Sequence, residues 1–127
     1  MRGLGYILCT VVAVCVLLVL SQLLAKHSLR QARGEPGNVV HLLCALLPSL
    51  PFWLAIASII LAACLWLILL QSAPVSLLYP FLSLSYVLMV PAARLAFGEP
   101  ITLNKILGTA VICIGVLLVS RAGDFGA

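Results

Sequence analysis

The sequence predicts an all-α integral membrane protein with four transmembrane helices. Of its 127 residues, 65% are hydrophobic and 8% are charged, whereas a soluble domain carries roughly 25% charged residues. The mean hydropathy is +1.30. Four apolar segments of about 20 residues, the length that crosses a bilayer, fit into the chain with short connections. We therefore expect a single membrane domain over residues 1–127, with no room for a soluble catalytic domain.

The first predicted span covers residues 4–25. We interpret it as an uncleaved helix rather than a signal peptide, because cleavage after Ala25 would divide the polar end that follows the apolar run. Gln22 and Lys26 are four residues apart and share a helix face near the membrane boundary. Two interpretations remain open. Lys26 extends to water while Gln22 bonds another helix, or the two residues contact an anionic head group.

Residues 26–38 form the predicted polar loop, which holds Arg30, Arg33 and Glu35. The apolar segment 39–48 that follows is too short to span a bilayer. We expect a short interfacial or re-entrant helix there, or a kinked extension of the next span.

The second predicted span covers residues 50–71, with the aromatic residues Phe52 and Trp53 at one end as membrane-interface anchors. Trp66 lies deeper, where it faces lipid or forms one wall of a cavity. The short uncharged turn after Gln71 makes the second and third spans antiparallel.

The third predicted span, residues 75–96, carries a stripe of hydroxyl groups. They recur at spacings of three, four and three: Ser76, Tyr79, Ser83 and Tyr86. At about 100° per residue they fall on one face of a helix. Hydroxyls facing lipid are costly, so this face is expected to line a cavity or another helix and to bind the substrate. Pro80 and Pro91 each remove a backbone donor and favour a bend.

The third span ends near Arg94, and a turn containing Glu99 leads to the fourth span, residues 102–121, with Thr102 as a candidate N-cap. Gly108 and Gly115 lie seven residues apart on one face. Small residues at this interval allow close helix approach, so this face is a candidate packing or dimerisation surface.

The charges favour a membrane role over nucleic-acid binding. The net charge is +4, and the seven Lys and Arg residues lie near the ends of apolar runs rather than in one stripe. The positive-inside rule, by a small excess, places both termini outside and the two odd-numbered loops in the cytoplasm. The five cysteines are not spaced like metal ligands, and we interpret them as small apolar residues. No metal or other cofactor is therefore expected.

Several short motifs together resemble a known group of transporters. They are Ser21-Gln22-Leu23 with Lys26, Pro74-Val75, Tyr79-Pro80, Leu82 to Val87, Glu99-Pro100, and Gly108 to Gly115. In order and spacing the chain, apart from residues 28–50, resembles the small four-helix members of the drug/metabolite transporter superfamily, and most closely the aminoarabinose-phosphoundecaprenol flippase subunits. The resemblance implies a small multidrug-resistance-like architecture in the bacterial inner membrane, a polyprenyl-phosphate lipid substrate, and a homodimer or a heterodimer with a related small subunit.

The chain departs from the small multidrug-resistance transporters at one position. Those transporters carry a membrane-embedded glutamate eight residues before the lysine that matches Lys26, and here that position is Leu18. The acidic residues are Glu35, Glu99 and Asp124, all outside the predicted spans. Proton-coupled export of a cation needs an anion within the membrane, so this mechanism requires a partner subunit to supply one.

We therefore expect a flippase or flippase subunit for an undecaprenyl-phosphate-linked sugar. Its phosphate would meet Lys26 or Arg94 at the membrane boundary, its sugar would lie along the hydroxyl stripe near Gln22, and Glu99 would face an amine. The alternatives are a small-molecule or cation exporter of the same superfamily and a non-transporting membrane subunit. An enzyme is not expected, because no nucleophile, base and acid converge in the sequence.

Overall fold

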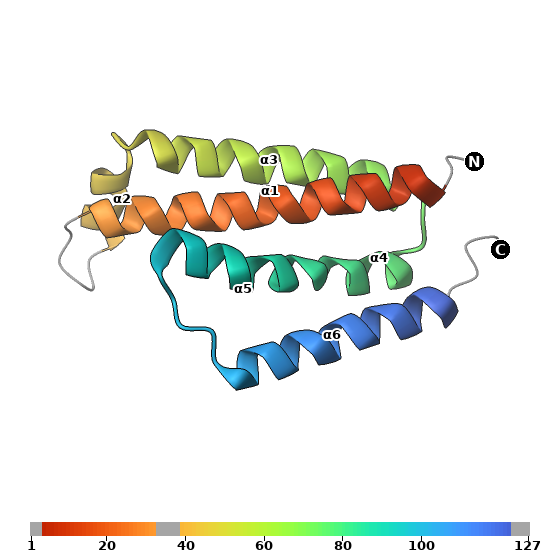
Figure 1. Cartoon of the computed structure of the whole chain (residues 1–127). Helices are drawn as coiled ribbons and strands as arrows, with labels where there is room; N and C mark the ends of the chain where they lie inside the picture. Colours follow the sequence, from red (N-terminus) through yellow and green to blue (C-terminus); the bar gives the residue numbers. More distant parts are fainter. Residues whose placement is uncertain (1–3, 33–38, 123–127) are drawn as a thin grey trace.

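The computed structural model describes residues 4–32 and 39–122, and within these ranges it contains helices and no strands. The helices are α1 (Leu4–Gln31), α2 (Val39–Leu46), α3 (Leu50–Leu70), α4 (Val75–Leu82), α5 (Leu84–Phe97) and α6 (Leu103–Ala122) (Figure 1). Three stretches are long and apolar enough to cross a membrane, and a shorter apolar helix follows them: Gly5–Gln31, Leu50–Leu70, Leu78–Phe97 and Leu103–Val119. The prediction of an all-α membrane protein is confirmed.

Helix α1 continues past the end that we predicted for the first span. It runs to Gln31, and the Ala32 N–H donates to the Ser28 carbonyl at 2.9 Å. The first part of the predicted loop 26–38 is therefore helical, and the prediction was wrong there. The physical reason is that neither glycine nor proline interrupts residues 26–31, so polarity ends the membrane span without ending the helix. Arg33 and Glu35 lie outside the described residues.

The short helix α2 meets α3 at a sharp corner. Pro48 follows α2, and the Ser49 N–H donates to the Leu46 carbonyl at 2.9 Å. The Trp53 indole Nε1 donates to the Leu47 carbonyl at 2.8 Å, so this side chain fixes the corner. The short helix predicted before the second span is present, and its position at the membrane surface remains a prediction.

The third predicted span consists of two helices, α4 and α5, separated at Ser83. Pro80 has no N–H to donate to the preceding turn, and its ring disfavours a regular helix. Just beyond it, the Ser83 N–H donates to the Pro80 carbonyl at 3.1 Å, and the Tyr86 N–H donates to the Ser83 carbonyl at 3.0 Å. Pro91, in contrast, lies inside α5 without ending it.

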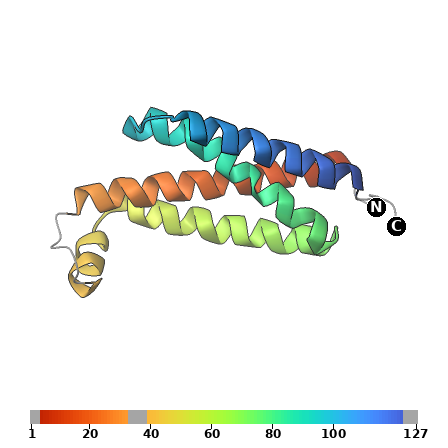
Figure 2. The ribbon, with the colours of Figure 1, turned by 90° about the horizontal axis from the view of Figure 1, so that it is seen from below.

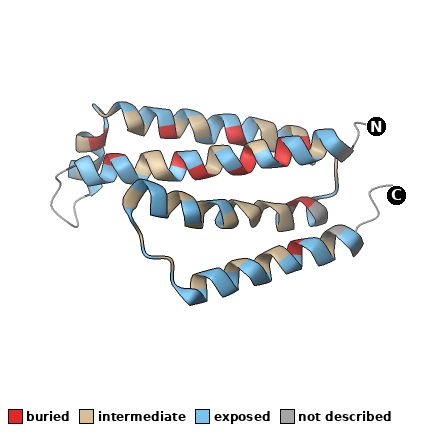
Figure 3. Ribbon diagram, viewed as in Figure 1, coloured by how far each residue is buried: buried red, intermediate tan, exposed pale blue. Residues whose placement is uncertain are grey.

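Helices α1 and α3 form the most closely packed pair of the fold. Their buried residues recur at intervals of seven: Val14, Ser21 and Ser28 on α1, and Ala55, Ala62 and Leu69 on α3. This interval is typical of helices that pack along a narrow seam, and small side chains allow a close approach. The Ser21 hydroxyl donates to the Leu18 carbonyl and the Ser28 hydroxyl to the Leu24 carbonyl, so burial leaves both satisfied. Figure 3 shows the buried positions concentrated on these two helices.

Helix α6 lies at the edge of the structure, beside α4 and α5 (Figures 1 and 2). Among the apolar side chains of α6, Val116 is buried and many others are exposed. Helices α3 and α6 run opposite to α1 and α5, so the turn after α3 reverses the chain as predicted. The ends of α1 and α5 and the start of α6 therefore lie at one end of the fold, where several charged residues gather.

Candidate functional site

The face of α1 beside α5 becomes more polar along its length. Four side chains spaced four residues apart occupy it: Leu18, Gln22, Lys26 and Arg30. At 3.6 residues per turn, each step of four turns the position by about 40°, so successive members of the series lie next to one another on the helix surface. The series passes from an apolar group through an amide to two cations, so one helix face connects the membrane interior to the charged end.

A cavity of 240 Å³ lies between α1 and α5, and we call it the α1–α5 cavity. It is lined by Leu18, Val19, Gln22, Ser85, Tyr86 and Met89. Its polar groups are therefore an amide from α1 and two hydroxyls from α5. The Ser85 hydroxyl already donates to the Leu82 carbonyl at 2.7 Å, so toward a ligand it acts as an acceptor, whereas the Gln22 amide offers both a donor and an acceptor.

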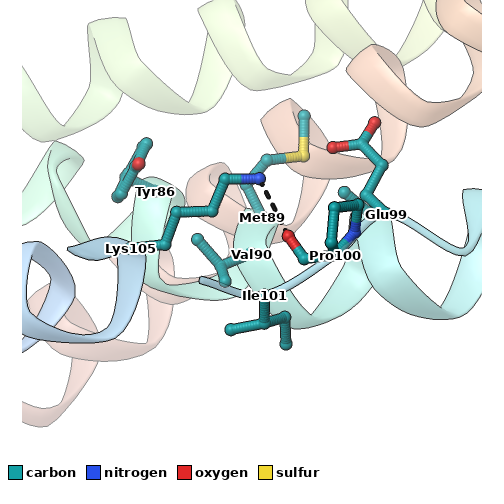
Figure 4. Close-up of a pocket in the computed structure, with 8 residues that line it drawn as sticks. Tyr86, Met89, Val90, Glu99, Pro100, Ile101 and Lys105 are labelled. Carbon is teal, nitrogen blue, oxygen red and sulfur yellow. Dashed lines mark hydrogen bonds between the residues drawn. The ribbon is translucent and has the colours of Figure 1, made fainter. Parts of the chain in front are cut away.

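A second cavity of 180 Å³ adjoins the first, and we call it the α5–α6 cavity (Figure 4). It is lined by Tyr86, Met89, Val90, Ala93, Glu99, Pro100, Ile101 and Lys105. Tyr86 and Met89 of α5 line both cavities. The Lys105 ammonium donates to the Pro100 carbonyl at 3.2 Å, which keeps this cation at the cavity wall (Figure 4).

The turn after α5 places Glu99 beside the end of α1. Gly98 has φ +68°, a left-handed conformation that favours glycine, and its N–H donates to the Arg94 carbonyl at 2.8 Å. The Glu99 carboxylate then accepts a hydrogen bond from the Lys26 ammonium in an ion pair. A local backbone requirement thus brings together two residues 73 positions apart.

Two cations of α1 lie over the ring of Phe97. The Lys26 Nζ is 4.9 Å from the ring centroid and the Arg30 Cζ is 4.5 Å from it. Such contacts are electrostatically favourable because the face of an aromatic ring is negative. Phe97 therefore holds both cations next to Glu99, and we call Lys26, Arg30, Phe97 and Glu99 the charged cluster.

The charged cluster keeps Glu99 ionised. The hydrogen bond from Lys26 is the largest influence, and it lowers the pKa of the Glu99 carboxyl below its ordinary value, with further contributions from the charges of Lys26, Lys105 and Arg30. Glu99 is therefore an anion at neutral pH, available to a cation at the edge of the α5–α6 cavity.

The predicted hydroxyl stripe does not run along one continuous helix in the structure. The break at Ser83 divides it, because Ser76 and Tyr79 lie on α4 and Tyr86 lies on α5. The Tyr79 ring packs edge-on against Trp66, with centroids 5.7 Å apart. The Ser83 hydroxyl donates to the Pro80 carbonyl of its own segment. Of the four, Tyr86 lines both described cavities, and the neighbouring Ser85 takes the place that we predicted for Ser83.

Trp66, whose surroundings the sequence left open, borders an apolar groove of 220 Å³. The groove is lined by Val14, Leu18, Ile59, Ala62, Ala63, Trp66 and Leu82. Leu18 also lines the α1–α5 cavity, so a polar hollow and an apolar groove meet at one side chain.

The remaining predicted residues lie on open surfaces. Arg94 is exposed, and it is Arg30 that joins Lys26 on the Phe97 ring. A Cβ added at Gly108 or Gly115 would meet nothing within 4 Å. Within the described chain neither glycine is a close-packing point, and their role in dimerisation remains a prediction.

Sequence reasoning missed Arg30, Phe97, Met89 and Lys105. The spacing of four between Lys26 and Arg30 could have identified Arg30. We did not use it, because we ended the first span at residue 25. Within residues 4–32 and 39–122, no three His, Cys, Asp or Glu side chains gather where they would hold a metal ion.

The chain was compared with known families and proteins. A model described as the EamA-like transporter family matches residues 3–121. A probable 4-amino-4-deoxy-L-arabinose-phosphoundecaprenol flippase subunit ArnE from Yersinia pestis (strain Pestoides F) is 51% identical over 70 residues, which cover 54% of this chain and 61% of the relative. The match therefore spans about three fifths of that relative. A protein of the same name from Pseudomonas syringae pv. syringae (strain B728a) is 36% identical over 107 residues, 84% of this chain and 94% of the relative. No solved structure matches.

Proposed function

Because the chain belongs to the EamA-like transporter family, we propose that it moves a polyprenyl-phosphate-linked amino sugar across the bacterial inner membrane as a flippase subunit. The chain is a multi-pass membrane protein of a transporter family, with relatives named as flippase subunits. The identity of the lipid, the inner-membrane location and a paralogous or identical partner subunit are parts of the proposal.

The observation that carries the proposal is the pair of adjoining cavities that share Tyr86 and Met89. They combine hydrogen-bonding groups within the span, Gln22 and Tyr86 among them, with charged groups at its end. A sugar phosphate needs both kinds of contact, because its hydroxyls require partners in a dry environment and its phosphate requires cations.

The apolar groove beyond Leu18 supports the same function. Its lining is formed by aliphatic side chains and the Trp66 ring, which suits an isoprenoid chain. A lipid would place its head group in the α1–α5 cavity while its chain stays in contact with apolar surface. The protein would then shield only the polar part during crossing.

The proposal is tested in cells that lack this chain and are complemented with it, so that any partner subunit is present. After translocation, the amine of the lipid becomes accessible to a membrane-impermeant amine-reactive reagent. We expect labelled lipid with the wild-type chain and about tenfold less with Gln22→Leu, which corresponds to about 1.4 kcal/mol of lost binding to the head group.

Gln71→Leu is the matched control, because it makes the same chemical change at an exposed position just after α3. It should retain wild-type labelling. Equal labelling with and without the chain, or transport of a small cation with no movement of lipid, would overturn the proposal.

A further inference from the structure

The charged cluster carries more positive than negative charge. Its two cations, Lys26 and Arg30, outnumber the single carboxylate of Glu99, and the charge of Lys105, a residue outside the cluster, also acts on Glu99. Lys105 is engaged with the Pro100 carbonyl, whereas Lys26 and Arg30 lie together on the Phe97 ring. An ion pair that served only to join α1 to the turn would need one of these two cations. The second leaves the cluster able to accept an anion.

The Lys26–Glu99 ion pair is also accessible. The Lys26 side chain is 46% exposed and that of Glu99 is 31% exposed. Exposed ion pairs contribute little to stability, because water and salt screen them and both side chains lose freedom in forming them. Replacing one partner by a ligand of the same charge therefore costs little, and an incoming ligand can separate the pair.

One member of the pair lines a cavity, and the other lies next to the lining residues. Glu99 lines the α5–α6 cavity. Lys26 follows Gln22 by one helical turn, and Gln22 lines the adjoining α1–α5 cavity. A ligand in the α5–α6 cavity thus meets the Glu99 carboxylate, and Lys26 and Arg30 lie beyond it on α1, over the Phe97 ring. This arrangement complements a molecule that carries both charges and extends past the cavity.

We propose that the Lys26–Glu99 ion pair is a charge-exchange site for a dipolar head group. The phosphate of the lipid binds Lys26 and Arg30, the ammonium of its sugar binds Glu99, and the internal ion pair separates as the two external ones form. This inference rests on the proposed function and extends it, because it assigns selectivity for an amine-bearing head group to Glu99. No covalent step is involved.

The test compares two lipids that differ in one charge: a polyprenyl-phosphate amino sugar, and the same lipid with its amine acetylated. Affinities are measured in membrane vesicles from the complemented cells, so that any partner subunit is present with the full chain. We expect the wild-type chain to bind the amine-bearing lipid about tenfold more tightly. Glu99→Gln should bring this ratio close to one, because the neutral side chain cannot distinguish the two head groups. Lys26→Gln should weaken binding of both lipids by a similar factor, because both carry the phosphate.

Arg121→Gln, at the other end of α6, is the matched control for loss of a cation, and it should leave both affinities unchanged. The exchanged pair Lys26→Glu with Glu99→Lys distinguishes a binding site from a purely structural contact. A structural contact would be restored by the exchange, with wild-type affinities. A charge-exchange site would stay impaired, because both charges would then face the wrong end of the lipid.

The two proposals fail in different ways. If the wild-type chain binds neither lipid, the proposed function is wrong. If it binds both lipids equally and Glu99→Gln changes nothing, or if the exchanged pair restores binding, then the charge-exchange inference is wrong while the flippase function stands.

Discussion

The two sides of α1 differ in how they are packed. Against α3, its seam is closely packed, with Val14 on α1 and Ala62 on α3 each 2% exposed. On the neighbouring face, toward α5, Leu18 and Gln22 border a cavity. The α1–α3 pair thus offers a fixed frame, while the side toward α5 and α6 retains room for a ligand. Adjacent faces of one helix therefore differ in role: the face of α1 toward α3 is closely packed, and the face toward α5 borders the candidate site.

The seam between α1 and α3 is the feature whose disruption should have the largest effect. Ala55 is 3% exposed on α3, so Ala55→Leu forces extra methyl groups into filled space. We expect the free energy of unfolding in mixed micelles to fall by about 1–3 kcal/mol. Ala57→Leu, at an exposed position two residues away, should change it by less than about 0.5 kcal/mol. Similar losses in both variants would show that the seam is not selectively close-packed.

The two tyrosines of the divided stripe should differ in their effect on transport. Tyr86 lines both cavities, whereas Tyr79 packs on Trp66. We expect Tyr86→Ala to reduce lipid labelling about tenfold, or about 1.4 kcal/mol, and Tyr79→Ala to leave most of it. Both proteins should be inserted in the membrane in equal amounts. Equal losses in transport would instead favour a continuous hydroxyl surface across the break at Ser83.

Two glycines should respond to alanine with opposite signs. Gly98→Ala places a side chain at φ +68° and is expected to destabilise the protein by about 1 kcal/mol, while shifting Glu99 away from Lys26. Gly108→Ala lies within α6, where the added Cβ meets nothing, so it should be neutral or stabilise by up to about 1 kcal/mol. Thermal unfolding of the two variants measures both effects. A destabilising Gly108→Ala would point to a partner helix at that surface.

The smallest effect is expected from pH. Because its partners lower the pKa of Glu99, the stabilising contribution of the ion pair is present above the ordinary carboxyl pKa and is lost as the pH falls through the lower folded-state value. The distance between spin labels at the exposed Leu29 and Leu103 should therefore stay constant from about pH 8 to pH 5 and increase below this range. Glu99→Gln should remove that step. An unchanged step in this variant would exclude Glu99 as its source.

The helices themselves were predictable, because runs of apolar residues of membrane length admit few other structures. The end of α1 was not, because the polar sequence from Lys26 onward signals exit from lipid, and a helix continues through it as long as no glycine or proline intervenes. The division at Ser83 was only partly predictable. Two prolines favoured bends, and nothing local indicated that Pro80 would precede a break while Pro91 would be accommodated within α5.

The residues of the candidate site were also only partly predictable from the sequence. The spacing of Gln22 and Lys26 predicted a common face; Gln22 lines the α1–α5 cavity, and Lys26 pairs with Glu99, which lines the α5–α6 cavity. The contact of Lys26 with Glu99 was not predictable from spacing, because it depends on where α5 ends and how Gly98 turns the chain. Phe97 was missed for the same reason, because the cations that lie over its ring are distant in sequence. Arg30 was missed because we ended the first span at residue 25.

The most direct test of the account is to locate a bound lipid. A polyprenyl-phosphate amino sugar with a photoreactive group on the sugar would be cross-linked to the full chain in membranes, and the labelled peptides identified by mass spectrometry. The account predicts labelling around Gln22 on α1 and between Ser85 and Met89 on α5. Labelling confined to the outer surfaces of α3 or α6 would contradict it.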